Sequence, residues 1–212
     1  EYNAGIAHSA LRSVFDELPT GRKDYIEGLG EMYKTLYGKL LKPTEATLFL
    51  DKTPRYYLIL PELKEVFPAA RYILLVRHPL SVLTSILRTW VNGRWRHLVN
   101  HKEDLLEAPR KIKKAQNNFG ENAVVVRYED IVQDPQSGVA LICKHLQINF
   151  EPKMINYGDV NKKSWKYGDP KSVYKHDRPK TSSLEKWVQP DNAQEWRLLW
   201  EYAHLLGSDT FE

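Results

Sequence analysis

An arginine and a serine eight residues apart, Arg77 and Ser85, are the side chains in this sequence best suited to hold an anion. Arg77 directly follows the apolar run 72–76, and Pro79 begins a segment with helical spacing. The start of a helix presents N–H groups and partial positive charge, and a guanidinium matches the oxygens of a phosphate. The hydroxyl of Ser85, about two turns further on, would reach the same anion. Taken alone, the pattern is also typical of an exposed arginine and a serine that faces solvent.

Two other polar segments follow short β-type runs. Lys52 lies in the Lys-Thr-Pro segment after Thr47–Leu50, and Tyr128 lies in the Arg-Tyr-Glu-Asp segment at the end of Ala123–Arg127. In an open parallel sheet, ligands bind beyond the carboxyl ends of the strands. We therefore expect these strand ends to contribute to one site.

Helical and β-type segments alternate along the chain, which predicts an α/β fold with a parallel β-sheet flanked by helices. The continuous apolar runs indicate strands covered on both faces. We expect three strands, at 47–50, 72–76 and 123–127. Apolar residues at helical spacing predict helices at 10–18, 24–41, 56–67, 79–90, 103–117, 134–146 and 192–206.

Composition favours a globular domain that binds a small anionic ligand. The 212 residues are the length of a single domain, expected to span 1–212, with 42% hydrophobic residues and a net charge of +4. This mild basic excess argues against a nucleic acid as the partner. We expect the one cysteine, Cys143, to be buried. The absence of a disulfide pair, of Asn-x-Ser/Thr signals, of a signal peptide and of a transmembrane-length apolar run favours a cytoplasmic location.

Two stretches of the sequence resemble the sulfotransferase family. The first is FLDKTPRYYLILPELKEVFPAARYILLVRHPLSVLTS and the second is VVVRYEDIVQDPQSGVALICKHLQINFEP. The resemblance is close over residues 48–152 and reaches Trp187 loosely. It implies the P-loop-like fold of that family, with 3′-phosphoadenosine-5′-phosphosulfate (PAPS) as co-substrate, adenosine 3′,5′-bisphosphate (PAP) as product, and no metal.

The same resemblance implies roles for individual residues. Arg77 and Ser85 match the positions that bind the 3′-phosphate, with His78 standing where Asp is common. Tyr128 matches a tyrosine beside the adenine, and Lys52 matches a lysine that faces the donor sulfate. Two residues of a later basic loop are further candidates for contact with the nucleotide, Arg178 and Lys180.

One hallmark of the family is missing from this chain. A loop similar to P-K/R-S-G-T-T, which would cradle the 5′-phosphosulfate, does not occur in it. We expect that loop to precede Glu1, and residues 1–18 to lie near the site without forming the first strand. The sequence does not identify the catalytic base either, and His8, Asp51 and His97 are the candidates.

The acceptor is not readable from the sequence. A hydroxyl, or less often an amine, of a small molecule, carbohydrate or peptide fits the family. The segment WVNGRWR at 90–96 is an expected acceptor-side loop. Several aromatic residues near the expected mouth would form an acceptor pocket or a capping loop, although each is also typical of core packing: Tyr56, Tyr57, Trp90, Trp95, Trp165, Tyr167 and Tyr174.

Two other functions stay open on the sequence alone. One is a catalytically inactive nucleotide-binding or interaction domain of the same fold. The other is a nucleotide kinase-like phosphotransferase, which would need a complete Walker loop and a magnesium carboxylate, neither of which is visible. The oligomeric state is not predicted.

Overall fold

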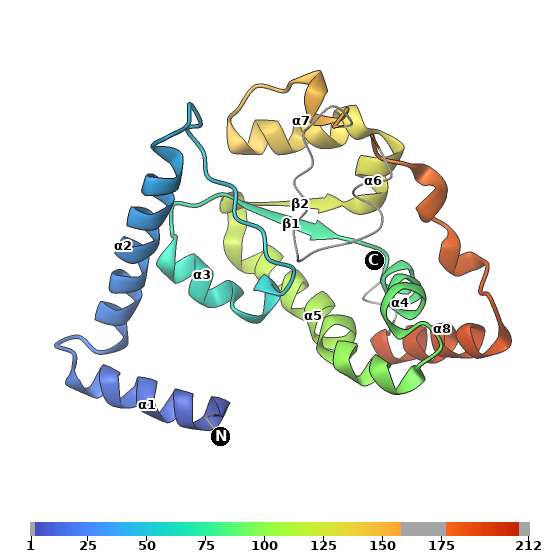
Figure 1. Cartoon of the computed structure of the whole chain (residues 1–212), viewed down its shortest axis with the longest axis horizontal. Helices are drawn as coiled ribbons and strands as arrows, with labels where there is room; N and C mark the ends of the chain where they lie inside the picture. The colour runs from blue at the N-terminus through green and yellow to red at the C-terminus, as the bar shows by residue number, and fades with distance from the viewer. Residues whose placement is uncertain (1–2, 158–176, 208–212) are drawn as a thin grey trace. The chain divides into compact units, whose positions relative to one another are not determined.

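The computed structural model describes residues 3–157 and 177–207. The chain divides into two compact units, Glu1–Ala70 and Arg71–Glu212 (Figure 1). The first unit is helical. The second contains a parallel sheet with helices around it, which confirms the predicted α/β class.

The described part of the first unit contains α1 (Ala4–Glu17), α2 (Arg22–Leu41) and α3 (Leu60–Val66). Helix α1 begins earlier than predicted because the side chain of Asn3 caps it, accepting a hydrogen bond of 3.1 Å from the N–H of Ile6. Arg22 at the start of α2 forms an ion pair with Glu65 of α3. Residues 4–17 are thus helical, and they do not form a first strand, as expected.

The strand predicted at 47–50 is wrong. These residues have no regular secondary structure and pair with no neighbouring strand among the residues described. Instead, the ring of Phe49 stacks on Tyr37 of α2, with centroids 4.1 Å apart. A short β-type run becomes a strand only when another strand satisfies its backbone groups, and a local sequence pattern does not report that partner.

The second unit is built on strands β1 (Tyr72–Val76) and β2 (Ala123–Arg127), which confirm two predictions residue for residue. They pair in parallel, from Tyr72 opposite Ala123 to Val76 opposite Arg127. Helices α5 (Lys102–Phe119) and α7 (Pro135–Leu146) pack against the sheet and lie on opposite sides of it in Figure 1. The remaining helices of the unit are α4 (Pro79–Ile86), α6 (Tyr128–Gln133) and α8 (Ala193–Leu206).

The helix predicted at 79–90 changes its winding near its end. Helix α4 stops at Ile86 and continues as a wider π-helical turn, Leu87–Val91. Asn92 and Gly93 then adopt positive φ angles of 45° and 78°, so the Asn-Gly dipeptide makes the turn that its sequence indicates. Arg88 lies within this wide turn.

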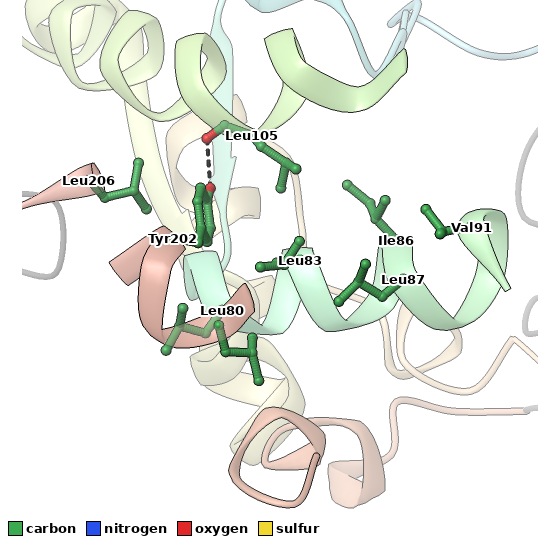
Figure 2. Close-up of a cluster of buried hydrophobic side chains, with 9 residues drawn as sticks. Leu80, Leu83, Ile86, Leu87, Val91, Leu105, Tyr202 and Leu206 are labelled. Carbon is green, nitrogen blue, oxygen red and sulfur yellow. Dashed lines mark hydrogen bonds between the residues drawn. The ribbon is translucent and has the colours of Figure 1, made fainter. Parts of the chain in front are cut away.

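A buried cluster fixes α4 between α5 and α8 (Figure 2). Val91, from the wide turn that follows α4, belongs to this cluster and is fully buried. The hydroxyl of Tyr202 donates a 2.6 Å hydrogen bond to the carbonyl of Leu105, and burial raises the pKa of this phenol. The cluster consists of Leu80, Leu83, Ile86, Leu87, Val91, Leu105, Leu199, Tyr202 and Leu206.

Helix α6 was not predicted, because its six residues are too few to show a helical period. Helix α7 follows at once, capped by Asp134, whose side chain accepts a 3.1 Å hydrogen bond from the N–H of Ser137. Cys143 on α7 is buried, as predicted. None of the described helices combines the length and the apolar character needed to cross a membrane.

Candidate functional site

The parallel register places Arg77 and Tyr128 at the same edge of the sheet. Val76 and Arg127 are the last paired residues of β1 and β2, so the residues that follow them emerge side by side. The guanidinium carbon of Arg77 lies over the ring of Tyr128, 4.5 Å from its centroid. Both side chains are half-buried. This cation–π contact holds the guanidinium at the start of α4, where an arriving anion would also meet the positive end of the helix.

Glu129 ties the two strand ends together. Its carboxylate accepts a 2.9 Å hydrogen bond from the backbone N–H of His78, the residue after Arg77. Burial lowers the pKa of the His78 imidazole, and Arg127 lowers it further, while the Glu129 carboxylate acts in the opposite direction. We therefore expect a neutral His78 at pH 7. The sulfotransferase family commonly has an aspartate at this position. With a histidine there instead, one negative charge fewer lies beside the proposed phosphate site.

The ring of His78 stacks on Trp187. The two centroids are 4.6 Å apart and the planes are inclined by only 10°. Trp187 belongs to the C-terminal segment, which also receives a 3.3 Å hydrogen bond from the hydroxyl of Ser81 to the carbonyl of Leu184. The start of α4 is therefore covered by a segment more than a hundred residues away in sequence.

The same C-terminal segment is also attached near Tyr128. The N–H of Tyr157 donates a 2.9 Å hydrogen bond to the carbonyl of Asp177. Burial raises the pKa of the Tyr157 phenol, and the neighbouring Tyr128 and Asp177 raise it further. Arg178 and Lys180 lie in sequence between this attachment and the one at Ser81, and both are exposed. The basic segment is thus attached on both sides, to Tyr157 and to Ser81.

Ser85 lies on the last turn of α4 and is exposed. The helical rise places it about 9 Å along the axis from Pro79. Its role toward the 3′-phosphate stays a prediction.

Lys52 belongs to the first unit and is exposed. Its neighbour Asp51 accepts hydrogen bonds from the hydroxyls of Tyr37 and Tyr56, the second of them 2.8 Å long. Asp51 therefore organises the aromatic side chains beside Lys52. The roles of Lys52 toward the sulfate and of Asp51 as a base stay predictions.

The other candidate residues lie in different surroundings. Trp90 is exposed on the wide turn, whereas Trp95 packs against the buried cluster. Trp165, Tyr167 and Tyr174 lie outside the described residues. His97, a candidate base, is exposed. Within residues 3–157 and 177–207, no group of three or more His, Cys, Asp or Glu side chains could hold a metal ion.

Sequence reasoning left three contributors without a role. Glu129 lies in the Arg-Tyr-Glu-Asp segment, and its position directly after a predicted strand could have identified it as a site residue. Ser81 and Trp187 gave no such signal, because their contact partners are distant in sequence. In chemical terms, the arrangement offers a guanidinium, a helix start and a flat aromatic ring within one small region, which suits a phosphorylated aromatic base.

Comparisons with known proteins point to one family. A model of the Sulfotransferase family matches residues 16–152, more than half of the chain. Nodulation protein NoeE of Sinorhizobium fredii (strain NBRC 101917 / NGR234) is 34% identical over 70 residues, which are 33% of this chain and 17% of NoeE. The chain therefore spans about a sixth of that curated relative.

Two solved structures have a similar fold. The sulfotransferase domain from the curacin biosynthetic pathway matches with a TM-score of 0.55, and the sulfotransferase domain from the Synechococcus PCC 7002 olefin synthase with 0.56. Each is 24% identical and covers 79% of this chain, which in turn covers 66% and 62% of those domains. With the family model matched across both strands and the Arg77 segment between them, the chain belongs to the Sulfotransferase family.

Proposed function

We propose that this chain carries the nucleotide-binding part of a sulfotransferase that moves a sulfuryl group from PAPS to a hydroxyl, or less often an amine. The observation that carries the proposal is the position of Arg77, laid over Tyr128 at the paired ends of β1 and β2. A guanidinium held there by an aromatic ring is oriented before any ligand arrives. Such preorganisation lowers the entropy cost of binding a phosphate.

In this proposal, the 3′-phosphate binds to Arg77 at the start of α4 and to the hydroxyl of Ser85. Tyr128 lies beside the adenine, and the basic segment with Arg178 and Lys180 closes over the nucleotide. The charges are complementary, since the bisphosphate is strongly anionic and all three basic side chains are cationic at neutral pH.

The transfer step would be an in-line attack by the acceptor on the sulfur atom. The S–O bond to the nucleotide phosphate breaks, and negative charge develops on the bridging oxygen. Lys52 is proposed to stabilise that charge through its ammonium group. A base, for which Asp51, His8 and His97 remain candidates, would take the acceptor proton. The acceptor itself is proposed only as a small molecule, carbohydrate or peptide.

The proposal is tested by comparing two nucleotides in calorimetric titrations of the 212-residue chain. PAP should bind at least roughly tenfold more tightly than AMP, which lacks the 3′-phosphate, because a hydrogen-bonded charge pair contributes about 1.5–3 kcal/mol. Equal affinity for the two nucleotides would contradict a 3′-phosphate site. Tight binding of ATP with magnesium in preference to PAP would favour the kinase-like alternative instead.

The role of Lys52 predicts a difference between donor and product. Lys52→Ala should weaken binding of PAPS, which carries the sulfate, by roughly threefold to tenfold. It should leave binding of PAP, which lacks the sulfate, within about twofold, since the lysine is proposed to face only the sulfate. Fluorescence titration with both nucleotides measures the two effects. An equal loss for both would place Lys52 elsewhere in the site or outside it.

A further inference from the structure

A buried carboxylate, Glu195, joins the first turn of α8 to the wide turn after α4. Only 2% of Glu195 is exposed. One carboxylate oxygen accepts a 3.1 Å hydrogen bond from Nε of Arg88, and the other lies 3.4 Å from Nη2 of the same guanidinium. An ionised group so deeply buried requires a partner, and Arg88 presents its guanidinium edge to both oxygens.

The same guanidinium also contacts the loop that precedes α8. Its Nη2 donates to the carbonyl of Gln189 at 2.9 Å and to that of Lys186 at 3.4 Å. It also lies 3.1 Å from the carboxylate of Asp191, whose own N–H donates a 2.8 Å hydrogen bond to Glu195. Arg88 thus contacts four residues of the segment 186–195.

This network continues to the strand end. The segment held by Arg88 includes Trp187, which stacks on His78, and His78 directly follows Arg77. The carbonyl of Leu184 is held by Ser81. The C-terminal segment is therefore attached to α4 and the wide turn at successive points, and the ion pair in the first turn of α8 is the last of them.

Stability alone does not account for a buried ion pair at this position. Helix α8 is already anchored by Leu199, Tyr202 and Leu206, and a buried ion pair contributes little net stability compared with apolar side chains of similar volume. What the pair does provide is a unique geometry, because its several hydrogen bonds form together only in one arrangement of the loop.

We propose that Arg88 and Glu195 are positioning residues, which hold the segment 177–190 over the strand ends and thereby set the affinity for the 3′-phosphate. The second half of this inference rests on the proposed function. The first half, that the ion pair holds the segment, does not depend on any ligand.

The test uses Glu195→Gln, which keeps the shape of the side chain and removes its charge. Hydrogen exchange, measured without nucleotide, should show the amides of 177–190 exchanging at least about tenfold faster, because local opening becomes easier. Amides of α5 should stay within about twofold. The matched control is Glu201→Gln on the same helix, whose ion pair with Arg197 is on the surface and should affect neither measurement.

Calorimetric titration with PAP provides the second measurement. Glu195→Gln should weaken binding by roughly fivefold to thirtyfold, and Trp187→Ala should do the same. The double variant should lose much less than the product of the two losses, because both changes release one segment. Merely structural roles at two separate places would give losses that multiply.

The outcomes separate the two proposals. Unchanged exchange in Glu195→Gln overturns the inference, and so does faster exchange with unchanged PAP affinity. A wild-type chain that does not bind PAP contradicts the proposed function, while the exchange data still decide whether the ion pair holds the segment. If Glu195→Gln does not fold, Arg88→Lys keeps the charge but loses the planar fork, and the same two results are expected of it.

Discussion

Replacing Arg77 by alanine is expected to weaken the binding of PAP by roughly tenfold to a hundredfold, while affinity for AMP changes little. The guanidinium is the group placed to meet the 3′-phosphate, and its contact with Tyr128 holds it in a single orientation. Its loss removes a charge-assisted hydrogen bond from a half-buried site, where solvent screens the interaction less than at the surface. Calorimetric titrations with the two nucleotides measure both affinities.

Two further variants sharpen the result. Arg77→Lys keeps the positive charge but loses the planar guanidinium, which can donate two parallel hydrogen bonds. Its affinity for PAP should therefore lie between those of wild type and Arg77→Ala. Arg127→Ala is the matched control, because Arg127 ends β2 at the neighbouring position in the register and is exposed. It should change PAP binding by no more than about threefold. A similar loss in both arginine variants would show a general electrostatic effect and contradict a specific phosphate contact.

Leu199→Ala should destabilise the second unit by about 2–5 kcal/mol. Leu199 is 2% exposed and lies in the cluster that fixes α4 against α5 and α8. Truncation removes buried methyl groups and leaves a cavity that the two flanking helices fill only in part. Thermal unfolding followed by circular dichroism should show a Tm lower by roughly 5–15 °C.

Leu205→Ala on the same helix is the control, since 64% of Leu205 is exposed. Its effect should stay within about 0.5 kcal/mol. Because the cluster also fixes the helix that begins beside Arg77, Leu199→Ala should weaken PAP binding at temperatures near its own Tm and not well below it. A Tm equal to that of wild type would mean that the cluster is not the core of this unit.

Sequence reasoning succeeded where the signal is local. The two paired strands were predicted residue for residue, because their runs of apolar, largely β-branched residues are a local signal. The expectation that both faces are covered does not hold throughout, since Leu75 is 55% exposed. Helix α8 was predicted at 192–206, within one residue of its bounds, and Asn192 caps it by accepting a hydrogen bond from the N–H of Glu195. The place of Arg77 between a strand and a helix start was predicted for the same reason and is confirmed, whereas its role toward a phosphate stays a prediction.

The tertiary structure decided what depends on partners far apart in sequence. Residues 47–50 form no strand, because pairing requires a neighbour that a local pattern does not report. The stack of Trp187 on His78 and the ion pair of Arg88 with Glu195 join segments separated by about a hundred residues. Side-chain type and spacing thus determined which residues could bind an anion, whereas strand register and long-range packing decided which of them meet, because only folding brings distant segments into contact.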